Sequence, residues 1–289
     1  MRLAAFVGTA ILALPCVSAA QDLSPGDIFV DCEDVCPQMV VIPAGVHLYG
    51  PPLNDDGSAR QRSLATFSRP FAIGRFEITF DEWDACVADG GCRAPRLAQT
   101  GAEWDACRSR DGCSSHPDAI AGIPGADEGW GRGRRPAINL SRDDAELYLA
   151  WLSERTGQTY RLPSLAEWSY AGAGGSEWSI PFAGRWQDQA NLGYDVGRTL
   201  PVGAYSANSF GLHDMLGNVS EFVAGCVDYY RVPSDGTALA EGDCPGLLMV
   251  GGSWAQRSVD VIWQRPWSYG RRVATARTYG DGFRVARDL

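Results

Sequence analysis

The chain has 289 residues, 45% hydrophobic and 21% charged, a balance typical of a folded globular protein. Its 25 basic residues are all arginines and face 35 acidic residues, and the resulting net charge of −10 argues against nucleic acid as a partner. Because the sequence contains no lysine, Schiff-base chemistry and any lysine base are excluded.

The first 20 residues have the pattern of a secretory signal. An apolar run from Leu3 to Val17 precedes a small-residue cleavage site after Ala20. This run is too short to span a bilayer. A lipoprotein anchored through Cys16 is the alternative, but Pro15 is a poor context for it. We expect a periplasmic or secreted protein without a membrane span, whose net charge becomes −11 after one arginine leaves with the signal.

Eight cysteines remain after cleavage, and an even number in an exported chain is typical of a disulfide framework. Eight cysteines allow 105 pairings, among which local pairing is the simplest. A metal cluster is the rival interpretation, but the cysteine spacings and the three histidines do not fit a zinc site. The predicted disulfides are Cys32–Cys36, Cys86–Cys92, Cys107–Cys113 and Cys226–Cys244.

After the signal, residues 21–36 form a lead-in, and we expect its acidic part, 27–34, to lie on the surface. Residues 37–289 contain no linker between two composition regimes, so we interpret them as one domain. Two buried strands are predicted, one over the β-branched run 40–42 and one over 71–79.

Residues 50–67, rich in Pro, Asp and Ser, are predicted to be a loop between these strands. Short strands and glycine-rich loops are predicted after residue 172. The ten tryptophans are more typical of loops pinned to a core than of ligand contacts.

Three helices are predicted from capping boxes, in which a Ser or Thr precedes an acidic residue by three positions. They are a helix over 81–88 capped by Thr79 with Glu82, a core-packing helix capped by Ser141 with Asp144 that ends at Gly157, and a helix capped by Ser164 with Glu167 that ends by Gly172.

A short repeat follows the first helix. The pattern E-W-D-A-C at 82–86, with Cys92, returns at 103–107 with Cys113, displaced by 21 residues. Two copies do not make a solenoid. We favour a structural duplication of a disulfide-clipped helix end over a recognition element.

The segment 209–222 places Asp214 and Glu221 seven residues apart, with Gly217 between them. Carboxylates and the carbonyls of a glycine-bent backbone are the hard oxygen ligands that Ca²⁺ prefers. A strand-turn-strand with two solvated acids is the alternative.

The same segment, S-F-G-L-H-D-M-L-G-N-V-S-E-F, resembles the signature of the formylglycine-generating enzyme or sulfatase-modifying factor family, with Ser220 and Phe222 at two tryptophan positions. Other family motifs stand in the expected order. They are M-V-V-I-P-A-G at 39–45, P-F-A-I-G-R-F-E-I-T at 70–79, R-L-P-S-L-A-E-W at 161–168, G-G-S-W at 251–254 and D-G-F-R at 281–284.

The resemblance implies a compact α+β domain of the formylglycine-generating-enzyme fold, related to C-type lectins and low in regular secondary structure. It also implies a structural Ca²⁺ bound by the side chains of Asp214 and Glu221 and by the carbonyls of Gly217 and Val219. A second calcium site would begin at Asn191 and Leu192, with Asp195 as a further ligand.

In the catalytic relatives, two redox cysteines bind copper in the pattern G-G-S-[WY]-x-C-x-x-x-x-C. Here Gln256 and Val261 occupy these two positions, and neither side chain replaces a thiolate. We therefore expect no copper and no formylglycine generation by this mechanism. The residues matching the wall of the family's substrate groove are Ser253, Trp254, Gln256, Arg277 and Arg284, of which the two arginines have buried ion pairing as an alternative role.

Other chemistry finds little support. The chain lacks the histidine triad and added helical domain of the sulfoxide-synthase relatives, and no histidine-acid pair points to Ser253. Two function classes remain. One is an exported binding or accessory module for a peptide, protein or small ligand; the other is a periplasmic oxidoreductase or maturation enzyme of altered chemistry, as in the pyoverdine-associated relatives.

Overall fold

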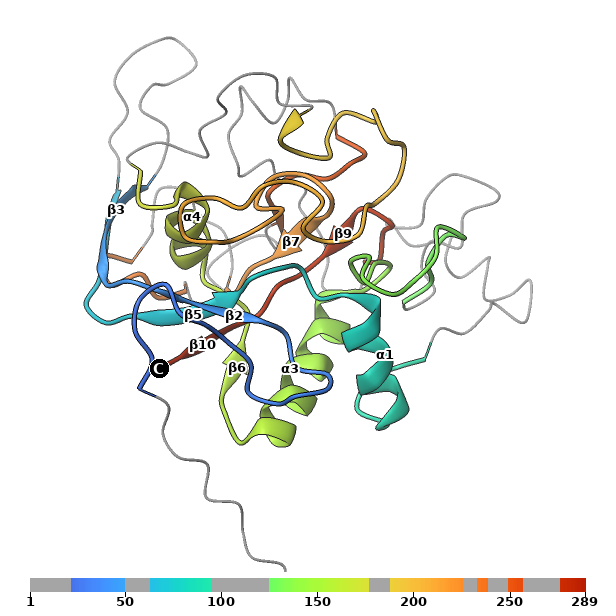
Figure 1. The fold of residues 1–289 in the computed structure, drawn as a ribbon, viewed down its shortest axis with the longest axis horizontal. Helices are drawn as coiled ribbons and strands as arrows, with labels where there is room; N and C mark the ends of the chain where they lie inside the picture. Colours follow the sequence, from blue (N-terminus) through green and yellow to red (C-terminus); the bar gives the residue numbers. More distant parts are fainter. Residues whose placement is uncertain are drawn as a thin grey trace, which may run out of the picture.

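The computed structural model describes residues 22–49, 63–94, 125–176, 188–225, 233–238, 249–256 and 276–289. Three helices and ten short strands are described (Figure 1). The helices are α1 (Phe80–Ala88), α3 (Arg142–Thr156) and α4 (Leu165–Ala173). The strands are β1 (Ile28–Phe29), β2 (Met39–Ile42), β3 (Gly45–Tyr49), β4 (Ser63–Phe67), β5 (Phe71–Gly74), β6 (Tyr160–Arg161), β7 (Ser220–Phe222), β8 (Met249–Val250), β9 (Asp281–Gly282) and β10 (Ala286–Asp288).

The main sheet has the strand order β1-β2-β5-β10-β6, and every neighbouring pair is antiparallel. All four residues of β2 are buried, which explains its uninterrupted apolar sequence. Met39 and Val41 enter one hydrophobic core, whereas Val40 and Ile42 enter another. The sheet therefore separates two cores, because successive side chains of a strand point to opposite faces.

Helices complete both cores (Figure 1). Trp83 of α1 and Tyr148 of α3 belong to the first core, and Trp168 of α4 belongs to the second. Trp83 and Trp168 are both fully buried, but they lie in helices and so anchor helices, not the loops of the prediction, to a core. Such a side chain stabilises the fold by about 2–3 kcal/mol through burial alone.

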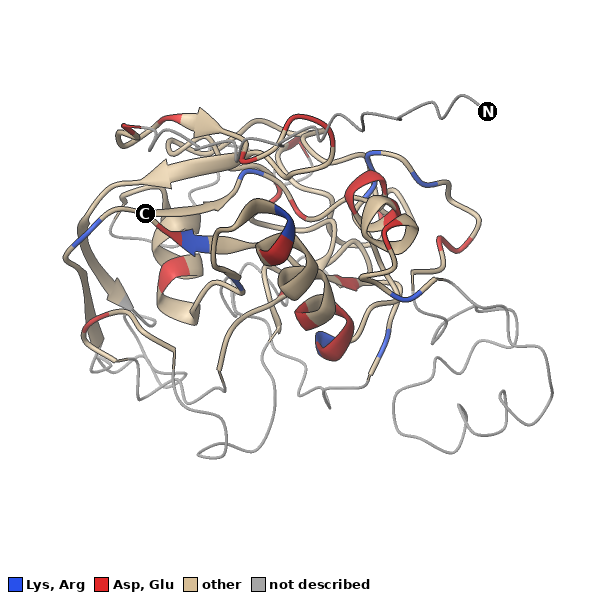
Figure 2. Ribbon diagram, turned by 90° about the horizontal axis from the view of Figure 1, so that it is seen from below, with Lys and Arg blue, Asp and Glu red and all other residues tan. Residues whose placement is uncertain are grey.

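All three predicted capping boxes are confirmed. Each N-cap oxygen accepts the backbone N–H three residues on, and the acid at that position accepts the N-cap N–H. Figure 2 shows acidic residues on the helices. Each helix has at least one acid in its first turn, where a negative charge interacts favourably with the positive end of the helix dipole. The predicted end of α4 at Gly172 was wrong, because Gly172 lies inside the helix and Gly174 adopts the left-handed cap.

Three strand predictions need correction. Residues 63–67, predicted as loop, form β4 and pair with β3; residues 50–62 lie outside the described part. The strand predicted over 71–79 ends at Gly74, because the backbone of Arg75 bonds instead to Gln38 and to His213. The lead-in does not lie wholly on the surface, since Phe29 is buried and β1 pairs with β2.

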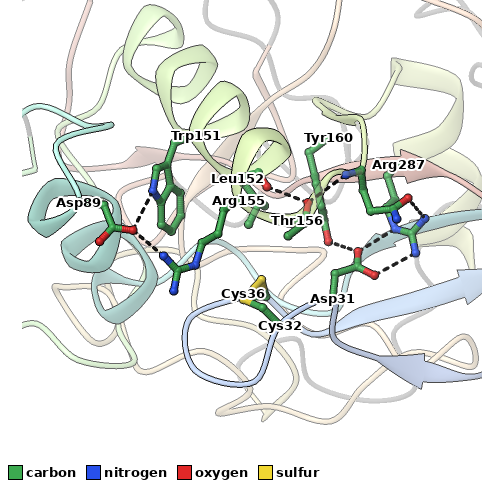
Figure 3. The surroundings of a disulfide bond; sticks show 11 residues. Asp31, Cys32, Cys36, Asp89, Trp151, Leu152, Arg155, Thr156, Tyr160 and Arg287 are labelled. Carbon is green, nitrogen blue, oxygen red and sulfur yellow. Dashed lines mark hydrogen bonds and ion pairs between the residues drawn. A yellow bond between two sulfur atoms is a disulfide. The ribbon is translucent and has the colours of Figure 1, made fainter. Parts of the chain in front are cut away.

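Asp31, at the end of this lead-in, is also enclosed (Figure 3). Its carboxylate accepts the Tyr160 hydroxyl and pairs with Arg287, at 2.9 Å from Nε. Burial and the bond to Asp31 raise the pKa of the Tyr160 hydroxyl. The Cys32–Cys36 disulfide lies directly beside this network and closes the turn that follows Asp31.

The second predicted disulfide in the described part, Cys86–Cys92, is formed at the end of α1. Cys107–Cys113, Cys226–Cys244, the second repeat copy and the signal segment lie outside the described residues. Among the residues that the structure covers, no helix has the length and apolar character needed to cross a membrane.

Candidate functional site

A bent backbone between α4 and β7 brings together the two segments predicted to bind calcium. Asp214, Gly217 and Asn218 all have positive φ angles, of 54°, 81° and 59°. Gly217 is required, because a Cβ there would lie 2.4 Å from the backbone oxygen of Asn191. The backbone N–H of Asn218 donates to the same oxygen. The predicted bend is thus confirmed, and residue 191 packs directly on it.

Glu221, one predicted ligand, is fully buried and bonded on both carboxylate oxygens. Arg284 donates to Oε2 from Nε at 2.7 Å and to Oε1 from Nη2 at 2.6 Å. Trp168 Nε1 donates to Oε2 at 2.8 Å. The remaining Arg284 donors reach the carbonyls of Gly74 and His213. Arg284 is also fully buried, so its predicted place in the groove wall is corrected to the alternative, a buried ion pair.

Sequence reasoning missed a third acid in this cluster, Glu77. Its side chain is 1% exposed and accepts the Val219 N–H and the Asn218 amide. Burial, followed by the charges of Asp214 and Glu221, raises the pKa of Glu77 well above its usual range, against a lowering by Arg284. The signal available in the sequence was an acid between Phe76 and Ile78 in an apolar stretch.

Asp214 completes the cluster. It is 9% exposed, and its Oδ2 accepts the backbone N–H of Gly203 at 2.7 Å. Burial raises the pKa of the Asp214 carboxyl, although the Gly203 N–H and Arg284 lower it. Three buried carboxyl groups thus share one guanidinium, which is bonded to Glu221. The raised pKa values of Glu77 and Asp214 favour their protonated forms, and a bound cation would favour the charged forms instead.

The number of acids here favours a hard cation, although Arg284, which donates to both Glu221 oxygens, opposes one. The bond from Gly203 uses only Oδ2 of Asp214, which leaves its Oδ1 for a cation. The two Glu221 oxygens accept three N–H groups and have about four lone-pair sites, so they have room for one more partner. The described residues contain no group of three or more His, Cys, Asp and Glu side chains suited to a metal. The expected ligands accordingly include the Gly217 and Val219 carbonyls.

The second predicted set is less favourable. Asn191 Oδ1 is buried without a hydrogen-bond partner, which is expected of an oxygen atom that coordinates a cation. Leu192 is buried, and Asp195 is exposed in the same loop. Two guanidiniums border the loop, however, because Arg135 donates to the Thr199 carbonyl and Arg198 follows in the chain. Their charge opposes a dication at this position.

The predicted groove residues form a tight turn beside this loop. Ser253 is 4% exposed, and its N–H donates to the side-chain oxygen of Gln256 at 3.2 Å. The Gln256 amide is thus folded back on its own turn. The backbone N–H of Tyr194 donates to the Trp254 carbonyl, so the 191–194 segment is bonded directly to this turn.

Trp254 lies at the centre of a group of four aromatic rings, which we call the aromatic cluster. Its ring centroid is 5.1 Å from that of Trp130, 5.5 Å from that of Tyr279 and 5.8 Å from that of Tyr194. Tyr194 is 56% exposed, so the cluster reaches solvent. Sequence analysis missed the three outer rings; each adjoins a glycine, but so do Tyr49 and Phe210, so this signal does not single them out.

Arg277 is an ion-pair partner, not an open groove residue. Its Nε lies 2.7 Å from Oδ2 of Asp144, the fully buried acid in the capping box of α3. Burial would raise the pKa of Asp144, but bonds from Arg277 and Ser141 lower it. The pair therefore joins the 276–280 segment to the start of α3. Val261, the other redox cysteine position, lies outside the described residues.

The model of the sulfatase-modifying factor enzyme 1-like domain matches residues 25–289. The chain belongs to this family. It is 32% identical over 251 residues to a hercynine oxygenase of Mycolicibacterium thermoresistibile, covering 76% of this chain and 51% of that protein. It is 27% identical over 236 residues to the formylglycine-generating enzyme of Thermomonospora curvata, covering 68% and 73%.

Among solved structures, PvdO from Pseudomonas aeruginosa superposes with a TM-score of 0.75 at 33% identity, covering 92% of this chain and all of that one. The family and the compact α+β fold implied by the sequence motifs are confirmed. The matched segments span 21% to 46% of the first curated relatives, which are longer proteins.

Proposed function

We propose that this family member is an exported binding or accessory module that uses the aromatic cluster to hold a peptide, protein or small ligand. The observation that carries the proposal is the composition of the turn at 253–256. An amide stands where catalytic relatives have a thiolate, and four aromatic rings gather around the neighbouring Trp254.

The chemistry of Gln256 supports loss of the family reaction. Copper-dependent oxidation needs a thiolate both as the soft ligand and as the redox partner. The Gln256 side chain instead accepts a backbone N–H, and Val261 offers no ligand atom. Aromatic rings with one exposed member suit a binding role, because they provide large contact area at a small cost in conformational entropy.

The first test measures the family reaction. Incubation with Cu(I), oxygen and a peptide containing Cys-x-Pro-x-Arg should yield no aldehyde above the copper blank. The Gln256→Cys, Val261→Cys double variant is the matched control, and we expect it to retain Cu(I) in competition with a chelator while the unmodified protein does not. Aldehyde formation by the unmodified protein would overturn this part of the proposal.

The second test measures binding. A random peptide library is panned on the unmodified protein, on Tyr194→Ala and on Val46→Ala. Tyr194 belongs to the cluster, whereas Val46, 61% exposed, lies on β3. We expect sequences enriched on the unmodified protein and on Val46→Ala to be lost on Tyr194→Ala. Equal enrichment on all three would reject the aromatic cluster as the site.

If an enriched peptide is chemically altered on incubation, the protein is instead a maturation enzyme of altered chemistry, the second function class. Mass spectrometry of the recovered peptide distinguishes the two outcomes. The proposal also includes export, supported by the sequence of residues 1–20, and a structural Ca²⁺, supported by three buried carboxyl groups near a single guanidinium.

A further inference from the structure

A second surface, on the solvent side of the buried acids, carries arginines that form no ion pair with the described residues. Of the thirteen arginines in the described ranges, eight form ion pairs with Asp or Glu. Five form none there, although the chain has ten more acidic than basic residues. Two of these five, Arg75 and Arg134, lie against Phe76, and two more, Arg135 and Arg198, lie near each other in segments beside Arg134. The five are Arg69, Arg75, Arg134, Arg135 and Arg198.

Two of these guanidiniums lie close to the Phe76 ring. The guanidinium carbons of Arg75 and Arg134 lie 5.2 Å and 5.3 Å from its centroid, so they are no farther apart than the sum of these distances. The His213 ring stacks on Phe76 at 4.9 Å, and its Nδ1 lies 2.8 Å from the Tyr205 carbonyl oxygen. Two cations and an imidazole therefore share one partly exposed phenyl ring.

The other two arginines extend this surface along the chain. Arg135 donates to the Thr199 carbonyl, and the Val202 N–H donates to the Arg134 carbonyl, so residues 198–203 run beside 134–135. Burial and the neighbouring charge of Arg198 lower the pKa of the Arg135 guanidinium. We call the surface formed by Arg75, Phe76, Arg134, Arg135, Arg198 and His213 the Phe76 face.

Neutral groups hold these guanidiniums in place. Arg75 Nη1 donates to the Gln38 side chain at 3.0 Å, and its buried Nε has no hydrogen-bond partner. Arg135 donates to a backbone carbonyl. A neutral acceptor fixes the position of a guanidinium but leaves its charge uncompensated. Two acids act on this face without forming an ion pair with its arginines: Glu82 attracts Arg134, and Asp214 attracts His213.

We propose that the Phe76 face binds a ligand that carries two or more carboxylate groups. The planar fork of a guanidinium matches a carboxylate through two parallel hydrogen bonds. Four guanidiniums from three chain segments suit several anionic groups better than one, and the Phe76 ring offers apolar contact to the carbon skeleton between them. Asp214, which interacts with His213, is the acid closest in the chain to this histidine and opposes such a ligand, whereas acids beyond about 8 Å are screened at 0.15 M salt.

Two sources supply this chemistry, a small dicarboxylic acid and an acidic peptide. Isothermal titration with succinate and with a peptide of six glutamates separates them at fixed ionic strength. Comparable affinities for both probes identify a small dicarboxylate as sufficient, whereas binding that is much tighter for the peptide identifies a polypeptide ligand. Failure of both probes to bind the unmodified protein overturns the proposal.

The decisive variant is Arg75→Gln, Arg134→Gln, and its matched control is Arg69→Gln, the other unpaired arginine, which lies beside Phe71. We expect the double variant to lose affinity by about tenfold or more and Arg69→Gln to keep it. Arg198→Gln provides a second reading should the double variant fold poorly. Equal losses in Arg69→Gln, or full affinity in both Phe76-face variants, would contradict the assignment. The aromatic cluster takes no part in this test, so its outcome is independent of the proposed function.

Discussion

At the scale of single residues, the buried acids around Arg284 dominate the energetics. Burial alone would lower the pKa of this guanidinium, but the pairing with Glu221 raises it. Glu77 and Asp214 add to the same field. A buried charge that loses its partner is far more costly than a surface ion pair that is broken, because water cannot replace the missing interaction.

We therefore predict that Arg284→Met destabilises the fold by about 3–5 kcal/mol, since three carboxylates would remain buried without their guanidinium. Arg284→Lys should cost less, because it keeps the charge but cannot donate to both Glu221 oxygens. Urea unfolding of both variants gives the free energies. Arg69→Gln, an exposed and unpaired arginine, is the control and should stay within about 0.5 kcal/mol of the unmodified protein. A mild Arg284→Met effect would show that the pair contributes little.

At the scale of elements, the helices were predictable and several strands were not. Each capping box joins residues only three positions apart, so Thr79, Ser141 and Ser164 could be identified without tertiary information. The β4 strand owes its conformation to pairing with β3, which is a contact between separate segments. Its own sequence, which contains Ser, Ala and Thr, does not predict this pairing. At the end of α4, two nearby glycines were available, and only the backbone geometry distinguishes the left-handed Gly174 from the helical Gly172.

The capping box of α1 predicts a pH dependence. Burial raises the pKa of Glu82 to about 7 from 4.5, against lowering by the two bonds from Thr79. Between these values the folded state binds more protons than the unfolded state, so stability should fall as the pH rises from about 4.5 to 7 and then level off. The effect should be on the order of 1–3 kcal/mol.

Thermal melts from pH 5 to 8 in the presence of EGTA measure this dependence. The Glu82→Gln variant keeps a capping-box side chain but cannot titrate, so its melting temperature should depend less on pH. A Glu82→Gln profile parallel to that of the unmodified protein would assign the dependence to other acids.

The cysteine pattern makes a prediction at the same scale. Two of four expected local disulfides are present in the described residues, and we expect mass mapping of the non-reduced protein to find Cys107–Cys113 and Cys226–Cys244 as well. Each closes a short loop, so Cys86→Ala, Cys92→Ala should lower stability by about 2 kcal/mol in the chain-entropy picture. A free thiol at Cys226 or Cys244 would contradict the pairing and renew the case for redox chemistry.

At the scale of the whole molecule, the family and its fold could be predicted because six motifs occur in the expected order. The site could be predicted only in part. Glu77 reaches Asn218 and Val219 across 141 and 142 residues of sequence, and the aromatic cluster collects its rings from four separate loops. These residues come together only because the two cores pack on the main sheet. Local sequence patterns do not predict this packing.

The three buried carboxyl groups in this site lead to a last prediction, that a bound Ca²⁺ stabilises the folded protein. An ion that binds only the folded state adds about 2.7 kcal/mol at 100 times its Kd, which is worth several degrees in the melting temperature. We expect melts in Ca²⁺ and in EGTA to differ accordingly, and Asp214→Ala to abolish most of the difference while Asp195→Ala, in the less favourable second set, retains it. Tb³⁺ offers a direct reading, because the contact between Trp168 and Glu221 places an indole close enough to sensitise its luminescence. Glu221→Ala is the poorer variant, since it also removes the partner of Arg284. Equal melting temperatures in Ca²⁺ and EGTA, together with no sensitised Tb³⁺ luminescence, would contradict the prediction. The charge of the three carboxylates would then be balanced by Arg284 and by protonation alone.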